Sequence, residues 1–180
     1  MEKMTSGFRG IYRDIIKDPE NGIYIDSGWK NNSIMDRGRI LLASFMRGEM
    51  TTGIYKLGVG QGDPAWDNLN TEAIPKADPQ STNDLLVPHE PRIIVNKPDI
   101  TYLGDSDNPT DGPTTRLQIS VTLAPDYPPP PAPGESTFPL REFGLFGKFG
   151  ETEYMINSIR HPVIHKGITT TMIRMVRLYF

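Results

Sequence analysis

Apolar and polar residues alternate along much of this chain, a pattern that predicts β-strands rather than long helices. The clearest case is residues 116–124, where apolar side chains stand at every second position: Leu117, Ile119, Val121 and Leu123. One face of such a strand is expected to be buried, while the other faces water. Further extended segments are predicted at residues 54–60, 92–102, 141–149 and 154–159.

A β-hairpin is predicted at residues 10–27, because β-branched and aromatic residues flank a short run of turn formers. That run is Asp18-Pro19-Glu20-Asn21-Gly22. Pro19 presets the φ angle that a turn requires after Asp18, and Gly22 can adopt the left-handed conformation that closes a bulged hairpin.

One short helix is predicted at residues 34–47. Ser33 is the expected N-cap, with Asp36 three residues later as a variant of the capping box, and Gly48 is a stop signal. The helix carries one apolar stripe, formed by Leu41, Leu42, Phe45 and Met46. We expect this stripe to face either a sheet or a neighbouring subunit.

Two irregular excursions interrupt the predicted strands. Residues 63–90 are polar and interrupted by proline, with one helical turn expected near residues 69–73. Residues 125–139 include six prolines after Tyr127. We expect them to form a stiff polyproline II segment, either a spacer or a ligand for a module that binds such helices. The whole chain, residues 1–180, is therefore predicted to be one mainly β domain, an antiparallel β-sandwich with an N-terminal hairpin and one short helix.

The last predicted strand, at residues 167–180, is apolar on both faces. Such a strand is either central in a sheet or covered by another subunit. We therefore predict an assembly interface formed by the end of the chain and by the proline run: Met175, Val176, Leu178, Tyr179, Phe180, Pro128, Pro129, Pro130 and Pro131.

Composition narrows the possible function classes. The 180 residues include no cysteine, which excludes a disulfide scaffold, a thiol nucleophile and a thiolate metal site. The net charge of −3 combines an acidic middle, −8 over residues 61–140, with mildly basic ends of +2 and +3. This asymmetry fits either surfaces that meet head to tail in an assembly or a solvated acidic loop region. The chain has no basic run, so nucleic-acid binding is not expected. No signal peptide or long apolar segment is apparent, so we expect synthesis in the cytoplasm and no membrane span.

Glycines and histidines with suggestive spacing favour structural roles. Gly58, Gly60 and Gly62 follow a strand, but their spacing and the lack of a following helix favour turn glycines over a phosphate-binding loop. His161 and His165 have the spacing of a metal pair only on a helix, whereas an extended segment is expected there. We expect both of them, and His89 as well, to be surface or structural residues.

Acidic residues give no stronger signal. Asp105, Asp107 and Asp111 resemble calcium ligands on a loop, but turns use the same residues for local hydrogen bonds. Glu142 stands among apolar neighbours, yet Arg141 is adjacent, so we expect Glu142 to be paired or exposed. We therefore expect no cofactor, no metal and no enzymatic activity.

Two stretches of the chain resemble small structural proteins of bacteriophage tails and of related contractile injection particles. In the first, residues 34–62, a helix precedes a strand that ends in Leu57-Gly58-Val59-Gly60-Gln61-Gly62. The second begins with Arg141-Glu142-Phe143-Gly144-Leu145-Phe146, which resembles the R-E-x-G-L-F strand of those proteins. It continues to Pro162-Val163-Ile164-His165-Lys166 and a final apolar strand.

The resemblance implies a non-enzymatic virion subunit that docks at the baseplate, fibre attachment or collar, in several copies. Other tail or baseplate proteins and further copies of the chain, in a ring or trimer, are the partners implied. A neck or head-tail connector subunit is one alternative. Another is a glycan- or surface-binding β-sandwich module, for which Trp66 and Tyr127 are the candidate stacking residues.

Overall fold

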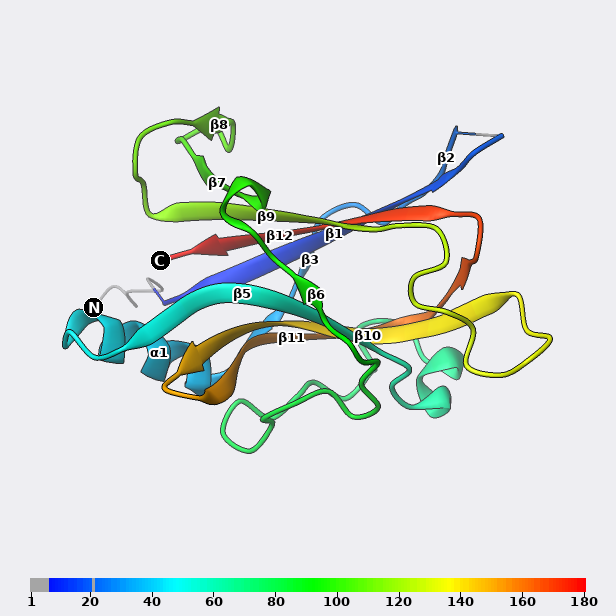
Figure 1. The fold of residues 1–180 in the computed structure, drawn as a ribbon, viewed down its shortest axis with the longest axis horizontal. Coiled ribbons are helices and arrows are strands. Elements are labelled where there is room, and N and C mark those ends of the chain that lie inside the picture. Colours follow the sequence, from blue (N-terminus) through cyan, green and yellow to red (C-terminus); the bar gives the residue numbers. More distant parts are fainter. Residues whose placement is uncertain (1–6, 21) are drawn as a thin grey trace.

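The computed structural model describes residues 7–20 and 22–180, which form two antiparallel sheets packed face to face with one α-helix (Figure 1). Sheet A has the order β2-β1-β12-β9-β7-β8, with β3 also paired to β1, and sheet B has the order β4-β11-β10-β5-β6. Sheet A contains β1 (Arg9–Asp18), β2 (Gly22–Asp26), β3 (Lys30–Asn31), β7 (Ile100–Leu103), β8 (Pro109–Thr110), β9 (Arg116–Leu123) and β12 (Thr171–Tyr179). Sheet B contains β4 (Ser33–Ile34), β5 (Thr51–Gly60), β6 (Ile93–Ile94), β10 (Thr137–Phe149) and β11 (Thr152–Gly167). The predicted mainly β, sandwich-like architecture is confirmed.

The predicted hairpin is present as β1 and β2, and Gly22 has the positive φ angle, 74°, that its turn position requires. Of the turn residues, Asn21 lies outside the described residues, as do residues 1–6 of the N-terminus. The strand predicted at residues 116–124 is β9, and those predicted at 141–149 and 154–159 are parts of the longer β10 and β11.

The last strand, β12, is central in sheet A. It lies between β1 and β9 and pairs with both along its length. Its inward side chains, among them Val176 and Leu178, are almost fully buried, while Met175 and Tyr179 point to the other face and are half-buried. Of the two alternatives for a strand that is apolar on both faces, the central position therefore describes this structure, and the chain's own sheets bury its inner face.

The main core fills the space between the two sheets. Side chains from both inner faces meet there, as in the edge-to-face contact of Tyr12 in β1 with Phe143 in β10, whose ring centroids are 5.5 Å apart. A second, smaller cluster lies on the outer face of sheet B and consists of Met35, Ala77, Leu85, Phe146 and Met155. Because Ala77 and Leu85 belong to the loop between β5 and β6, this cluster fastens that loop to the sheet.

The one predicted helix is present, but it begins two residues later than predicted. Helix α1 spans Asp36–Met46, and its N-cap is Met35, which makes no capping hydrogen bond through its side chain. Ser33, the predicted N-cap, instead lies in β4 and pairs with β11. A helical turn is expected near residues 69–73, and residues 71–73 form a hydrogen-bonded turn in which the Ala73 N–H donates to the Asn70 carbonyl at 3.0 Å. A 3₁₀ helix that was not predicted precedes this turn at Pro64–Asn68, where Asp63 caps the helix by accepting a hydrogen bond from the Ala65 N–H.

The proline-rich excursion is not a continuous polyproline II rod, and it ends earlier than predicted. Bends at residues 128, 131 and 132 and a turn at residues 133–134 break it, and β10 already begins at Thr137. The segment predicted as extended at 92–102 is also divided. A 3₁₀ helix at Lys97–Asp99 separates β6 in sheet B from β7 in sheet A, so the chain crosses between the sheets there (Figure 1).

Among the described residues, no helix combines the length and the apolar character needed to cross a membrane.

Candidate interaction surface

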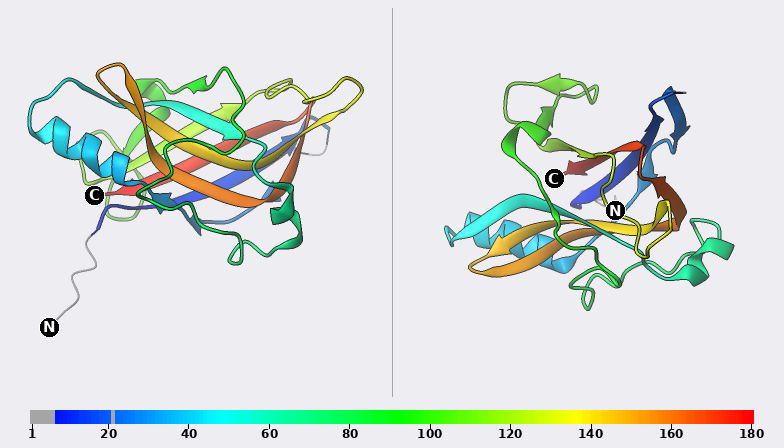
Figure 2. Two further views of the ribbon diagram at one scale, coloured as in Figure 1. Left: turned by 90° about the horizontal axis from the view of Figure 1, so that it is seen from below. Right: turned by 45° about the vertical axis from the view of Figure 1, so that its right-hand side comes forward.

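An apolar pocket lies at one end of the sandwich and is lined in part by α1 and by Phe180 at the C-terminus. The left view of Figure 2 shows the ribbon of α1 and the C-terminus at this end of the molecule. Its volume is about 250 Å³. The lining comes from α1, from the first residues of β5 and from the ends of β1, β9, β11 and β12. It consists of Phe8, Gly38, Leu41, Leu42, Phe45, Thr51, Thr52, Gly53, Ile54, Leu117, Ile156, Leu178 and Phe180.

Large apolar side chains at the mouth of this pocket are exposed to solvent. Leu42 is 41% exposed, Phe180 is 48% exposed and Phe45 is 67% exposed, although all three line the pocket. Next to them in the chain, Met46 and Met50 are 77% and 90% exposed. An apolar patch of this kind around a concavity is typical of a site that binds a protein partner.

Helix α1 contacts the sheet closely through only a few of its residues, and glycines make this close approach possible. Gly38 lies against β11, where an added Cβ would be only 2.8 Å from the carbonyl oxygen of Ile156. Leu41 packs on Gly147 of β10, where an added Cβ would lie 2.5 Å from Cδ1 of Leu41. Within α1 only Gly38 and Leu41 are buried, so the predicted apolar stripe is largely uncovered by the chain itself.

Both ends of the described chain meet at the mouth of the pocket. The ring of Phe8 stacks on that of Phe180 with centroids 4.7 Å apart. Phe180 is also held by its backbone N–H, which donates to the Thr115 carbonyl at 2.9 Å. Beside them, the Arg9 guanidinium lies over the Tyr179 ring at 4.0 Å. The antiparallel pairing of β1 with β12 is the reason for this arrangement, because it brings Arg9 opposite Tyr179.

The structure divides the sequence-predicted interface residues into four groups. Phe180 lies at the mouth of the pocket, and Met175 and Tyr179 lie on the outer face of sheet A. Val176 and Leu178 belong to the main core, although Leu178 also reaches the pocket lining. The proline run lies apart from the pocket lining: Pro128 is buried, Pro130 is half-buried, and Pro129 and Pro131 are exposed.

The outer face of sheet A carries interlocked aromatic and charged side chains. Arg177 lies 4.1 Å from the centre of the Trp29 ring and donates to Gln118 and Asp107 at 2.9 and 3.1 Å. The Tyr179 hydroxyl also donates to Asp107 at 3.1 Å. These contacts hold the side chains of this half-exposed face in one arrangement.

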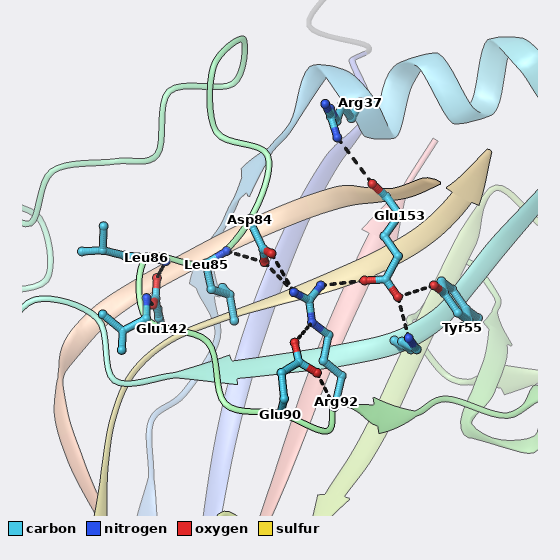
Figure 3. Close-up of polar contacts among 11 residues, drawn as sticks. Arg37, Tyr55, Asp84, Leu85, Leu86, Glu90, Arg92, Glu142 and Glu153 are labelled. Carbon is cyan, nitrogen blue, oxygen red and sulfur yellow. Dashed lines mark hydrogen bonds and ion pairs between the residues drawn. The ribbon is translucent and has the colours of Figure 1, made fainter. Parts of the chain in front are cut away.

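The outer face of sheet B, in contrast, is covered by the chain's own loop, residues 61–92. Glu142 of β10 fastens it: its carboxylate accepts hydrogen bonds from the backbone N–H groups of Leu86 at 3.0 Å and Val87 at 2.8 Å (Figure 3). Glu142 is 1% exposed. The expectation that it is exposed or paired with Arg141 is therefore wrong, since Arg141 binds Asp67 through two hydrogen bonds of 2.8 Å.

Arg92 is a second fastening point on the same face (Figure 3). Its guanidinium binds Asp84 and Glu153, at 2.7 and 3.0 Å, and lies 4.0 Å from the centre of the Phe146 ring. Burial alone would raise the pKa of Glu153, but hydrogen bonds from Lys56 and Tyr55 and the charge of Arg92 lower it overall. The acidic side chains of this cluster are thus bound to cations and backbone donors.

The histidines and the acidic loop residues differ in their burial and in their contacts. His161 is buried and His165 is exposed on the extended strand β11. In the described part of the chain, no three histidine, cysteine or acidic side chains are grouped as a metal site would require. Asp107 serves the outer face of sheet A, while Asp105 and Asp111 are exposed.

Gly60 and Gly62 permit close packing under the loop. A Cβ on Gly60 would lie 2.6 Å from the Val87 carbonyl oxygen, and one on Gly62 would lie 2.5 Å from the Trp66 ring. Gly62 also has a positive φ angle of 56°. The prediction of turn glycines is therefore wrong for Gly58 and Gly60, which lie within β5, whereas Gly62 has the positive φ angle of a turn glycine.

The two candidate glycan-stacking residues both contact other residues of the chain. Trp66 is only 5% exposed and has the Arg160 guanidinium 5.2 Å from its ring centre. Tyr127 is half-buried, and its hydroxyl donates to the Pro91 carbonyl at 2.9 Å. Trp66 holds the loop of residues 61–92 in place and is unavailable for stacking on a sugar.

Sequence reasoning identified part of the pocket. Phe180 is among the predicted contact residues and Phe45 is in the predicted helical stripe, but Phe8 carried no local signal. Phe8 and Phe180 are separated by almost the whole chain, and the register between β1 and β12 brings their rings together.

Comparison of the chain with models of known protein families, with curated proteins and with solved structures gives no match.

Proposed function

We propose that this protein is a non-enzymatic structural subunit of a phage tail or tail-like particle, and that it docks through the apolar pocket onto another protein of the particle. The partner inserts an apolar side chain between α1 and the stacked rings of Phe8 and Phe180. Docking at the baseplate, fibre attachment or collar is the location that the sequence resemblance implies.

The observation that carries this proposal is the exposure of Leu42, Phe45 and Phe180 around a concave apolar surface. Leaving such side chains in water forgoes a favourable burial of roughly 1.5–3 kcal/mol for each side chain that a partner covers completely. Aromatic side chains near a pocket are also the residues that contribute most to protein interfaces. The outer face of sheet A, with Trp29 and Arg177, supplies a second surface suited to contacts between copies in a ring or trimer.

The test is incorporation of the chain into particles. The chain is expressed with an epitope tag in a host that produces the particles, which are purified and probed for the tag. Wild-type protein is expected in the particles, whereas Phe45→Asp, which places a charge at the pocket mouth, is expected to remain in the soluble fraction. Circular dichroism and the melting temperature of the purified variant show whether it is folded.

Ile94→Asp is the matched control, because Ile94 is 56% exposed on β6 and is not among the residues that line the pocket. This variant is expected to be incorporated like the wild type. Absence of the wild-type protein from particles would refute the role in a tail. Normal incorporation of Phe45→Asp would refute the pocket as the docking site.

A further inference from the structure

A cluster of charged and titratable side chains is buried between the two sheets. Asp14 of β1, His161 of β11 and Arg174 of β12 are 1%, 3% and 0% exposed. Arg174 donates to both oxygens of Asp14, from Nε at 2.6 Å and from Nη2 at 2.9 Å. The same Nη2 lies 3.2 Å from Nε2 of His161. This last contact crosses from sheet A to sheet B.

The hydrogen-bond geometry assigns one protonation state to His161. A guanidinium only donates hydrogen bonds, so Nε2 of His161 must accept from Arg174 and carry no proton. The other ring nitrogen, Nδ1, lies 2.7 Å from the Pro162 carbonyl oxygen, which only accepts. Nδ1 must therefore carry the proton, and His161 is the neutral Nδ1–H tautomer.

Protonation of His161 would replace its attractive contact with Arg174 by a repulsive one. A second N–H would then point from Nε2 at the guanidinium, and two cations would face each other in a buried site. The charged groups near the ring are Arg174 on β12, Asp14 on β1 and Lys30 on β3, while β10 contributes the uncharged Phe143 ring with its centroid at 6.2 Å. Burial and then the charge of Arg174 lower the pKa of His161 to about 4, against the opposing effect of Asp14.

We propose that His161 is an acid-sensitive latch between the two sheets. When neutral, it accepts the Arg174 hydrogen bond and holds β11 against β12. When protonated, it repels Arg174, and the contact between the sheets is lost. The latch is independent of the proposed docking role.

The sign of the pH effect follows from the lowered pKa. In the unfolded chain His161 binds a proton near pH 6.5, whereas in the folded chain it binds one only near pH 4. Stability from this group is therefore complete above pH 6.5 and declines as the pH falls towards 4. The unfolding equilibrium constant is expected to rise by about 100-fold between pH 7 and pH 4 through His161 alone.

Two measurements test the latch. Long-range ¹H–¹⁵N NMR of the wild-type protein is expected to show the Nδ1–H tautomer of His161 at pH 7 and a His161 titration midpoint well below 6.5. Urea unfolding at a series of pH values is expected to show a stability loss between pH 6.5 and 4 that is absent in His161→Gln. Glutamine can accept from Arg174 and donate to the Pro162 carbonyl, but it does not titrate.

His165→Gln is the matched control, because His165 lies four residues further along β11 and is exposed. This variant is expected to keep the pH dependence of the wild type. An Nε2–H tautomer, or a His161 midpoint near 6.5, would overturn the proposal. So would an unchanged pH dependence in His161→Gln. The NMR titration decides the question on its own if that variant does not fold.

Discussion

Phe8 and Phe180 stack with their ring centroids 4.7 Å apart at the mouth of the apolar pocket. Phe8 precedes β1 and Phe180 follows β12, so the pairing of these two strands ends in an aromatic contact. The stack shapes one wall of the pocket that α1 borders on its other side. The proposed docking surface therefore depends on the contact between the residue that precedes β1 and the residue that follows β12.

The aromatic stack is expected to be measurable as a coupling energy. Phe180→Ala and Phe8→Ala should each lower the free energy of unfolding by about 1 kcal/mol, because both rings are only partly buried. In a double-mutant cycle the two changes should couple by about 0.5–1.5 kcal/mol. Urea unfolding of the four proteins measures this. Phe8→Ala combined with Met50→Ala, a 90% exposed residue, should be additive; equal behaviour of both cycles would contradict the stack.

Gly38→Ala is expected to destabilise the protein, although alanine favours helices. The substitution gains about 1 kcal/mol in helix propensity. It also places a Cβ 2.8 Å from the Ile156 carbonyl oxygen, and this backbone atom of β11 cannot move aside freely. The net loss should be about 1–3 kcal/mol, as for overpacked cores, measured as a lower melting temperature. Ser44→Ala in the same helix should be neutral or slightly stabilising, and a stable Gly38→Ala would show that α1 is less tightly seated.

Glu142→Ala is expected to release the loop of residues 61–92 from sheet B. The change removes the acceptor for the Leu86 and Val87 N–H groups and should lower stability by about 2 kcal/mol. Limited trypsin digestion provides a local measurement, since Lys76 lies exposed in this loop. Cleavage after Lys76 should be faster in Glu142→Ala than in the wild type. Glu72→Ala, which changes an exposed acid of the same loop, should be cut at the wild-type rate; no difference between the two variants would exclude the fastening role of Glu142.

Asp14→Asn is expected to lower the free energy of unfolding by about 3–5 kcal/mol, because it leaves the Arg174 charge buried without its carboxylate. Replacing both partners by apolar residues, as in Asp14→Leu with Arg174→Met, should recover much of that loss. Denaturant unfolding of the single and double variants tests this. The solvent-exposed pair of Arg13 and Asp26 is the comparison, and Arg13→Met should have a much smaller effect on the free energy of unfolding, because water screens this pair. A small effect of Asp14→Asn would mean that Arg174 finds another acceptor.

Local patterns were sufficient to predict several of the longer strands and the first hairpin turn. The alternation in β9 depends only on neighbouring residues, and so does the Pro19 and Gly22 chemistry of the first hairpin. The start of α1 was predicted less well, because Ser33 is drawn into β4 by its pairing with β11, a partner distant in sequence. Where a long-range hydrogen bond competes with a local cap, the sequence pattern alone cannot show which one forms.

The candidate surfaces show the same division. Phe45 and Phe180 were identified from an apolar helical stripe and an apolar chain end, and both line the pocket. Val176 was predicted to contact a partner but is in the core, because the central position of β12 became apparent only from its pairing with both β1 and β9.

By itself, the sequence determined that this protein is a β-rich, cysteine-free chain with one short helix, since strand alternation and turn chemistry act over a few residues. Only the tertiary structure decided which apolar residues are core and which are surface. It also brought Glu142 to Val87, 55 positions away, and Asp14 to Arg174, 160 positions away. Such contacts depend on strand order and register, because these determine which distant side chains share a face of a sheet.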